Sequence, residues 1–215
     1  MNLDNGMKIA ITGGIGSGKS YVCKKLRSLL GVEVFDCDAA AKRLMRTDAQ
    51  MIQQLTEAIG PDTYVDGKLN KAAVARFLLE SDQHTSIVNQ IVHPAVANDF
   101  RASGLNWMEC AILYESGFDR LVERVICVTA PDEIRLRRVM ERDHITEEKA
   151  KEWMAKQMPQ EMVREKADYE IVNDGQRNIE EQLCNIVQRL HLITEPKSEQ
   201  RIANTQHRII NSLNK

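Results

Sequence analysis

The sequence lacks a large excess of either charge. Its 215 residues include 29 Lys and Arg against 31 Asp and Glu, so the formal net charge is −2. A chain this close to neutral argues against general binding to nucleic acid or to an anionic membrane. Any positively charged site must therefore be local.

Long apolar runs, paired cysteines and internal repeats are also missing. The N-terminal MNLDNGMK has no long apolar stretch, and the run Ile9 to Ile11 is too short for a signal peptide or a membrane span. The sequence thus predicts a soluble, cytoplasmic chain of one domain with inserted subdomains. No C-x-x-C pair occurs, which predicts reduced cysteines, without disulfide or metal roles, at Cys23, Cys37, Cys110, Cys127 and Cys184.

What the sequence does contain is a phosphate-loop pattern, GGIGSGKS, from Gly13 to Ser20. An apolar strand-like run precedes it and a helical pattern follows, and that context disfavours the alternative of a glycine-rich turn with a surface lysine. Glycines let successive N–H groups point into one concavity, and the helix adds its positive end. Lys19 then reaches the β and γ phosphates of a nucleoside triphosphate, while the Ser20 hydroxyl helps to hold a hydrated Mg²⁺. The predicted nucleotide contacts are Gly13, Gly14, Ile15, Gly16, Ser17, Gly18, Lys19, Ser20 and Tyr21.

Short β-branched runs alternate with longer helical patterns, as in a parallel sheet flanked by helices. We therefore predict an α/β fold of the P-loop NTPase type, with a first helix from about Lys19 to Leu30 that ends at Gly31. The five predicted strands are Lys8 to Thr12, Val32 to Asp36, Met108 to Tyr114, Arg124 to Thr129, and Tyr169 to Val172.

Between the second and third predicted strands lies more helical sequence than one crossover needs. We predict a helical subdomain over about 39–104, beside the place for a second substrate, divided by a turn from Pro61 to Gly67. Asn70 is a possible N-cap within it. His93-Pro94 is expected to end the helical run Ile87 to Val92, and His93 either lines an acceptor pocket or is a structural residue at a helix end.

Four carboxylates lie on or beside the predicted strands. Asp36 ends the second strand, at the edge where open α/β sheets bind ligands, and is the candidate general base for an attacking hydroxyl. Asp38 is expected to be the N-cap of the helix Ala39 to Met45, which leaves Asp36 free. Glu115 closes the third predicted strand at the same edge and supports either the metal or the acceptor, or is a surface residue, whereas Glu109 begins that strand at the opposite end.

The stretch after the fourth predicted strand places Arg135, Arg138 and Arg142 on one helical face. Interleaved acidic residues allow a solvated face, but the position favours a lid over about 133–164 with Arg142 as its catalytic cation. The turn Asn173-Asp174-Gly175 follows the last predicted strand, and Asn173 is expected to contact the nucleotide. The alternative is that these residues occur here only because Asn, Asp and Gly favour turns.

Taken in order, these pieces resemble the dephospho-coenzyme A kinase family over about residues 8–190. The resemblance is carried by the phosphate loop and the later pieces DCD, IVHP, ILYE, TAPDEIRLRRVMERD, QMP, ADY and IVNDG. It implies ATP-dependent phosphorylation of the ribose 3′-hydroxyl of dephospho-coenzyme A, the last step of coenzyme A synthesis. The P-loop core is then expected over about 8–38, 105–132 and 165–190, with a tail at 191–215.

The resemblance also implies roles for single residues. Asp36 is the base toward the ribose hydroxyl, Lys19 and Arg142 hold the moving phosphoryl group, and the acceptor is placed by Asp38, His93 and Glu115. The chain departs from the family's usual residues at Tyr21, Lys42, Glu109, Ala111 and Arg135.

Two other functions stay open from the sequence. A kinase of another small acceptor, such as a nucleoside monophosphate or a sugar acid, shares the loop, the lid and the sheet. A nucleotide switch or hydrolase needs a water-orienting residue and a partner surface, and neither has a clear signal. In the tail, Ile202, Ile209 and Leu213 form one weak apolar stripe.

Overall fold

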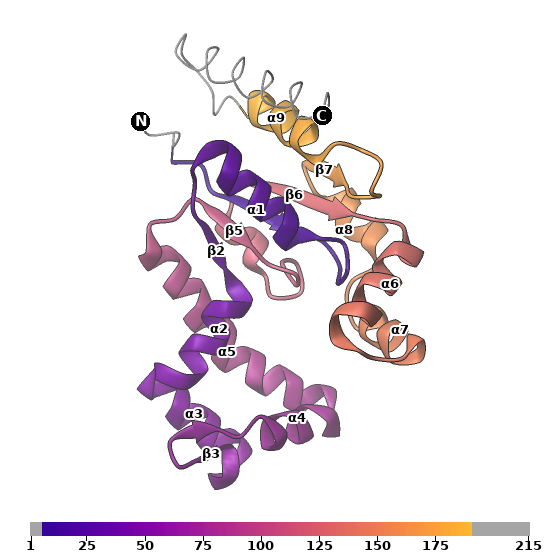
Figure 1. Cartoon of the computed structure of the whole chain (residues 1–215). Coiled ribbons are helices and arrows are strands. Elements are labelled where there is room, and N and C mark those ends of the chain that lie inside the picture. Colours follow the sequence, from indigo (N-terminus) through magenta and orange to yellow (C-terminus); the bar gives the residue numbers. More distant parts are fainter. Residues whose placement is uncertain (1–5, 191–215) are drawn as a thin grey trace.

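A computed structural model describes residues 6–190 and contains one five-stranded sheet (Figure 1). Its order is β2-β5-β1-β6-β7, and all four neighbouring pairs are parallel. The strands are β1 (Ile9–Thr12), β2 (Val34–Asp36), β5 (Trp107–Glu109), β6 (Arg124–Thr129) and β7 (Tyr169–Val172). The predicted α/β class with a five-stranded parallel sheet is confirmed, although the first three strands are shorter than expected.

Helices cover both faces of the sheet, because the buried strands are apolar on both sides. On one face, α1 (Lys19–Leu30) and α9 (Ile179–Arg189) pack side by side over a core that includes Ile11, Leu26 and Leu183 (Figure 1). Gly31 ends α1 in the left-handed conformation with φ 68°, as its position predicted. On the other face, α8 (Gln160–Lys166) lies against β6.

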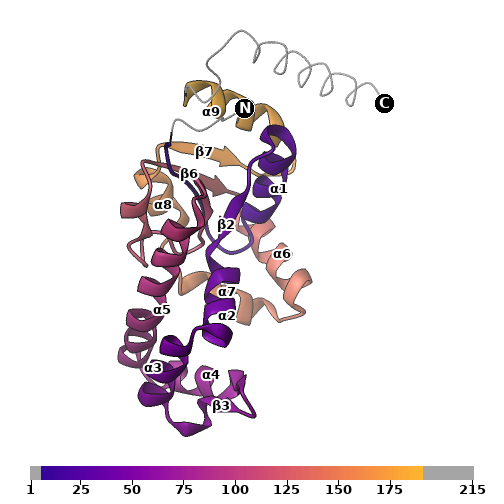
Figure 2. The same ribbon diagram turned by 90° about the vertical axis from the view of Figure 1, so that its left-hand side faces the viewer.

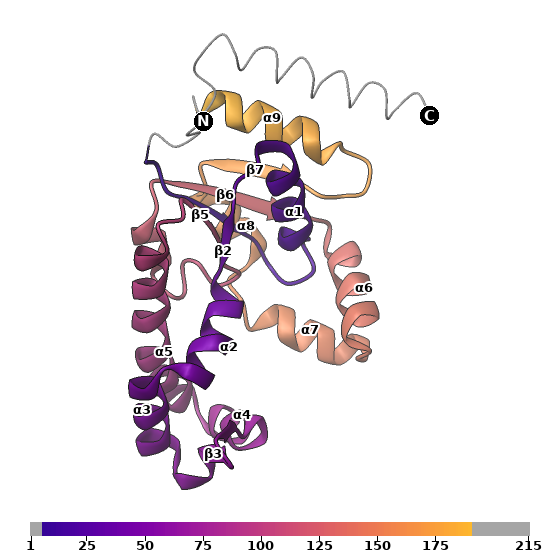
Figure 3. The same cartoon turned by 60° about the vertical axis from the view of Figure 1, so that its left-hand side comes forward.

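The segment between β2 and β5 is mainly helical and extends away from the sheet (Figures 2 and 3). Asn70 caps α4 by accepting from the Ala73 N–H, as predicted. The Pro61 to Gly67 region, expected only as a turn, contains the first strand and the turn of a small antiparallel hairpin, which ends at Leu69. The elements are α2 (Cys37–Thr47), α3 (Ala49–Ile59), the 3₁₀ turn η1 (Pro61–Thr63), β3 (Tyr64–Val65), β4 (Lys68–Leu69), α4 (Lys71–Glu80) and α5 (Asp82–Ser103).

The expectation that His93-Pro94 ends a helix is wrong. Helix α5 continues through Pro94 to Ser103. Its buried residues Val88, Val92, Val96 and Phe100 recur every fourth position and pack into the same core. Proline removes one helical donor, and the continuous apolar face on both sides of it outweighs that local loss.

The third predicted strand is also corrected. β5 ends at Glu109, and the residues predicted to extend it to Tyr114 form turns. The Cys110 N–H still donates to Ile11 O at 3.0 Å, after which backbone bonds become local, as in Phe118 N to Leu113 O at 2.9 Å. The apolar run therefore packs from a turn, where Leu113 is fully buried.

Three helices separate β6 from β7: α6 (Asp132–Asp143), α7 (Glu147–Ala155) and α8. All five cysteines are free thiols, four of them buried, as predicted. Within residues 6–190 no helix is both long and apolar enough to cross a membrane. The stripe Ile202, Ile209 and Leu213 lies outside the described residues.

Candidate active site

The loop after β1 follows a path that only glycine fits at two points. Gly13 has φ 141°, and a Cβ there would lie 2.2 Å from Val128 O. Gly18 has φ 93°, caps α1, and a Cβ there would lie 2.1 Å from Nδ2 of Asn173. Side chains are excluded by backbone conformation and by close neighbours, so the loop wraps closely against β6 and the end of β7.

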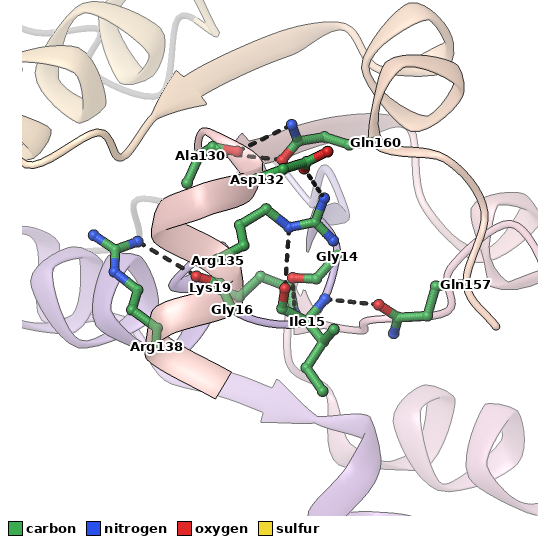
Figure 4. Close-up of polar contacts among 10 residues, drawn as sticks. All are labelled: Gly14, Ile15, Gly16, Lys19, Ala130, Asp132, Arg135, Arg138, Gln157 and Gln160. Atoms are coloured by element: carbon green, nitrogen blue, oxygen red, sulfur yellow. Dashed lines mark hydrogen bonds and ion pairs between the residues drawn. The ribbon is translucent and has the colours of Figure 1, made fainter. Parts of the chain in front are cut away.

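Three successive loop carbonyls, those of Ile15, Gly16 and Ser17, are held from outside the loop, and Figure 4 shows the contacts to the first two. Arg135 Nε donates to Ile15 O at 3.1 Å, and Asn173 Nδ2 donates to Ser17 O at 2.8 Å. Arg138 adds longer contacts of 3.4 Å to Gly16 O and Ser17 O. Because C=O and N–H point in opposite directions across a trans peptide, these bonds turn the following N–H groups away from the arginines. The Ser17 N–H donates to Gly14 O, and the turned N–H groups of Gly16 and Gly18 suit an anion.

Lys19 lies in the first turn of α1 and its Nζ donates to Gly14 O at 3.3 Å. Burial lowers the pKa of Lys19 from its usual value, and the Glu109 carboxylate opposes that shift. Desolvation of an ammonium favours capture of an anion that restores its lost solvation. Ser17 is buried, and its hydroxyl is one of two buried side-chain polar atoms without a hydrogen-bond partner in residues 6–190.

Glu109 is the acid next to the loop, and the sequence assigned it to the wrong end of its strand. It lies at the carboxyl end of β5, paired in register with Ile11 on one side and Asp36 on the other. Ser20 Oγ donates to its Oε1 at 2.7 Å. From the sequence, only the presence of an acidic residue pointed to Glu109. Its position beside the loop depends on where β5 ends.

Asp36 is exposed at the carboxyl end of β2, on the same edge as Glu109. Its Oδ1 accepts from the Ala39 N–H at 2.9 Å, so Asp36, and not Asp38, is the N-cap of α2. Asp38 lies in the first turn of that helix and pairs with Lys42. β2 ends at Asp36 and α2 begins at the next residue, Cys37, so no loop separates them.

His93 and the segment after β5 lie together. The His93 ring meets Phe118 edge-on, with 5.6 Å between ring centroids, and burial lowers the pKa of His93. Glu115, three residues before Phe118, accepts from the Met158 N–H at 2.9 Å. Glu115 therefore ties the segment between α7 and α8 to the turn after β5.

Arg142 does not lie with the other two arginines of its face. It is exposed in the last turn of α6, and its Nη2 is 2.6 Å from Asp143 Oδ2. By contrast, Arg135 and Arg138 contact the loop. The sequence missed these contacts because periodicity gives the face of a helix and not its depth.

A hollow of about 590 Å³ opens beside the start of α1 and the turn after β7. Tyr21, Arg138 and Asn173 border it, and Lys25 Nζ lies 5.6 Å from the centroid of the Tyr21 ring. Two of the predicted nucleotide contacts, Tyr21 and Asn173, therefore line the same hollow beside the loop.

Comparison with known proteins matches this arrangement to one family. The sequence model of dephospho-CoA kinase matches residues 7–181. The chain belongs to the dephospho-CoA kinase family. The dephospho-CoA kinase of Bacteroides fragilis is 36% identical over 203 residues, which is 89% of this chain and 98% of that protein.

Solved structures share the fold of this chain. A Thermus thermophilus protein of known crystal structure has a TM-score of 0.76 and 31% identity, covering 88% of this chain and 98% of its own. Shikimate kinase from Acinetobacter baumannii, at 18% identity and a TM-score of 0.52, covers 86% of this chain and 93% of its own and shares the fold alone.

Proposed function

We propose that this chain transfers the γ-phosphoryl group of ATP to the ribose 3′-hydroxyl of dephospho-CoA, giving CoA, ADP and a proton. This is the last step of coenzyme A synthesis, and we propose that it takes place in the cytoplasm. The observation that carries the proposal is a complete phosphate loop beside two strand-end carboxylates, Asp36 and Glu109, in a member of the dephospho-CoA kinase family.

In this mechanism the loop N–H groups and Lys19 hold the phosphates of ATP. The hollow beside the loop receives the rest of the nucleotide, with Tyr21 and Asn173 at its wall. Asp36 orients the attacking 3′-hydroxyl and takes its proton as the O–P bond forms and the bond to ADP breaks. Asp36 is exposed at the carboxyl edge of the sheet, which supports this role. The cap of α2 engages one of its two carboxylate oxygens, Oδ1.

The donor set at Ser20 suits Mg²⁺, which prefers oxygen ligands and keeps several of its waters. The Ser20 hydroxyl is exposed and within 2.7 Å of the Glu109 carboxylate, so a hard cation would find two oxygen groups together. Ser20 would bind the ion directly and Glu109 would accept from one of its waters. The ion would neutralise charge on the phosphates.

The remaining residues serve the acceptor and closure. We propose that Asp38, His93 and Glu115 border dephospho-CoA. We also propose that residues 133–164 form a lid that stays bonded at Arg135, Gln157 and Gln160. The part of the lid around Arg142 then moves, and Arg142 reaches the phosphoryl group when the site closes. The exposure of Arg142 supports this, because its only recorded ion pair within residues 6–190 is to the adjacent Asp143.

Mass spectrometry of products tests the function. The purified protein, ATP and Mg²⁺ are incubated with dephospho-CoA, with nucleoside monophosphates, with shikimate or without acceptor. We expect a mass gain of one phosphate on dephospho-CoA alone, and fragmentation that assigns it to the 3′ position. Phosphorylation of another acceptor with dephospho-CoA unchanged, or ATP hydrolysis independent of any acceptor, contradicts the proposal.

A further inference from the structure

The tip of the phosphate loop is a hydrogen-bonded turn. Ser17 N donates to Gly14 O at 3.2 Å, and Gly16 has φ 79°. A positive φ at the third residue of a four-residue turn is the mark of type II, with Ile15 at the second position. In such a turn the peptide joining Ile15 to Gly16 can flip, because glycine also accepts the type I conformation.

Both polar groups of Ile15 are held by side chains distant in sequence (Figure 4). Gln157 Oε1 accepts from the Ile15 N–H at 2.7 Å, and Arg135 Nε donates to Ile15 O at 3.1 Å. Arg135 is itself fixed, being 5% exposed and bonded to Asp132 at 2.9 Å. The contact from Gln157 therefore belongs to a two-sided clamp on one residue of the loop.

Gln157 is presented by an anchored segment. It lies between α7 and α8, and the next residue, Met158, donates its N–H to Glu115 at 2.9 Å. Gln160 binds both backbone groups of Ala130, at 3.1 Å each. The side chain of Gln157 is thus aimed at the loop from a segment that is bonded to two other parts of the sheet's edge.

The clamp has a consequence for phosphate binding. With Ile15 C=O turned toward Arg135, the N–H of Gly16 points to the opposite side of the same peptide. Holding the Ile15 N–H at Gln157 fixes the preceding peptide as well. Each bond removes a conformation in which the loop's donors are misdirected, and preorganised donors bind charge without reorganisation.

We propose that Gln157 is a positioning residue for phosphoryl transfer, acting through the Ile15 N–H to hold the phosphate loop in its anion-binding conformation. It does not itself contact the nucleotide. The proposal rests on the proposed function only for the identity of the nucleotide, and its binding test involves no acceptor.

Ile15→Pro provides a clean partner for a double-mutant cycle. Proline has no N–H, so it removes the donor that Gln157 accepts, and its fixed φ suits the second position of a type II turn. Gln157 is half-buried beside a cavity of about 620 Å³, which gives its side chain room to turn away from the ring. The cycle therefore isolates one hydrogen bond.

Calorimetry of ADP binding is measured for the wild type, Gln157→Met, Ile15→Pro and the double variant. We expect Gln157→Met to weaken ADP binding about three- to tenfold, the range for one lost hydrogen bond. In the Ile15→Pro background the same change should have no further effect. The KM for ATP should follow ADP affinity, with the KM for dephospho-CoA within about twofold of wild type.

Gln160→Met is the matched control, since it loosens the same segment without touching Ile15. Its effect, whatever its size, should be equal in both backgrounds. The proposal is overturned if Gln157→Met has no effect, or if its effect persists in the Ile15→Pro background. Should Gln157→Met melt below the assay temperature, Gln157→Asn, which withdraws the same oxygen by one methylene, replaces it. Failure to phosphorylate dephospho-CoA would refute the proposed function and leave this cycle interpretable.

Discussion

The two ends of α6 carry arginines in very different settings. Near its start, Arg135 is 5% exposed and bonded to a loop carbonyl and to Asp132. In its last turn, Arg142 is exposed and bonded only to the adjacent Asp143 among the interactions recorded for residues 6–190. One helical face therefore holds a cation fixed to the phosphate loop and a cation at the surface.

The energetic contrast follows from burial. Arg135 donates from a buried guanidinium to Ile15 O, and a hydrogen bond from a charged group contributes about 1.5–3 kcal/mol. Its ion-pair partner Asp132 is exposed and adds little to that. An exposed ion pair contributes about 0–1 kcal/mol. Arg142 can therefore leave Asp143 at little cost, whereas Arg135 cannot leave the loop. The start of the helix suits positioning, and its end suits a contact made only when the site closes.

Arg142→Ala should have the largest effect on catalysis. An arginine that meets the transferring phosphoryl group only after closure contributes about three to five decades to turnover in comparable sites. We expect a fall of that size in kcat, with ADP affinity within a few-fold of wild type by calorimetry. A loss of affinity equal to the loss of turnover would make Arg142 a ground-state contact and remove the contrast with Arg135.

Asp36→Asn extends the comparison with the arginines of α6 to a residue at the carboxyl edge of the sheet. Asparagine retains the oxygen that caps α2, so the fold is preserved, but it cannot take a proton. We expect kcat to fall by about two to four decades while ATP affinity is retained. Steady-state turnover beside calorimetry measures both. Turnover within a few-fold of wild type would move the base elsewhere, with Asp38 as the next candidate.

Arg135→Met removes the charge and the donors but keeps the length of the side chain. We expect ADP affinity to fall at least about tenfold, since hydrogen bonds to charged groups contribute more than neutral ones. The thermal midpoint should fall as well, because Ile15 O loses its donor. Arg137→Met, on the exposed side of the same helix, is the control and should change neither quantity.

The same residues show which parts of the fold and of the site could be predicted from the sequence. The phosphate loop, the five parallel strands and the helix ends at Gly31 and Asn70 were predictable, because each depends on local chemistry. Glu109 was misplaced because the apolar run CAILY fits a strand as well as it fits the observed turn, in which Cys110 and Leu113 are buried and Ala111 and Ile112 are exposed. Arg135 was recognised as part of a helical face, but its depth comes from how α6 docks on the loop, which periodicity does not contain.

Lys19 is another cation beside the phosphate loop. The effect of its substitution on the thermal stability of the nucleotide-free protein should be the smallest of the predicted effects. Burial lowers its pKa, so a protonated Lys19 destabilises the nucleotide-free fold. Lys19→Met should raise the thermal midpoint while sharply weakening nucleotide use. The gain should be full below the folded-state pKa and shrink as pH rises toward 10.5, the ordinary lysine value.

Thermal melts across pH with Lys24→Met as control test this prediction. Lys24 lies on the exposed side of α1, so its removal should leave the midpoint unchanged. A lower midpoint for Lys19→Met would mean that the lysine stabilises the empty loop.

The most direct test of the contrast within α6 uses a transition-state mimic. Affinity for ADP with aluminium fluoride, Mg²⁺ and dephospho-CoA is compared with affinity for ADP alone in wild type, Arg135→Met and Arg142→Ala, because such analogues reproduce the charge of the transferring phosphoryl group. The account predicts that Arg142→Ala loses decades of affinity for the mimic and little for ADP, whereas Arg135→Met weakens both by a similar factor. Equal losses for both ligands in Arg142→Ala would contradict it.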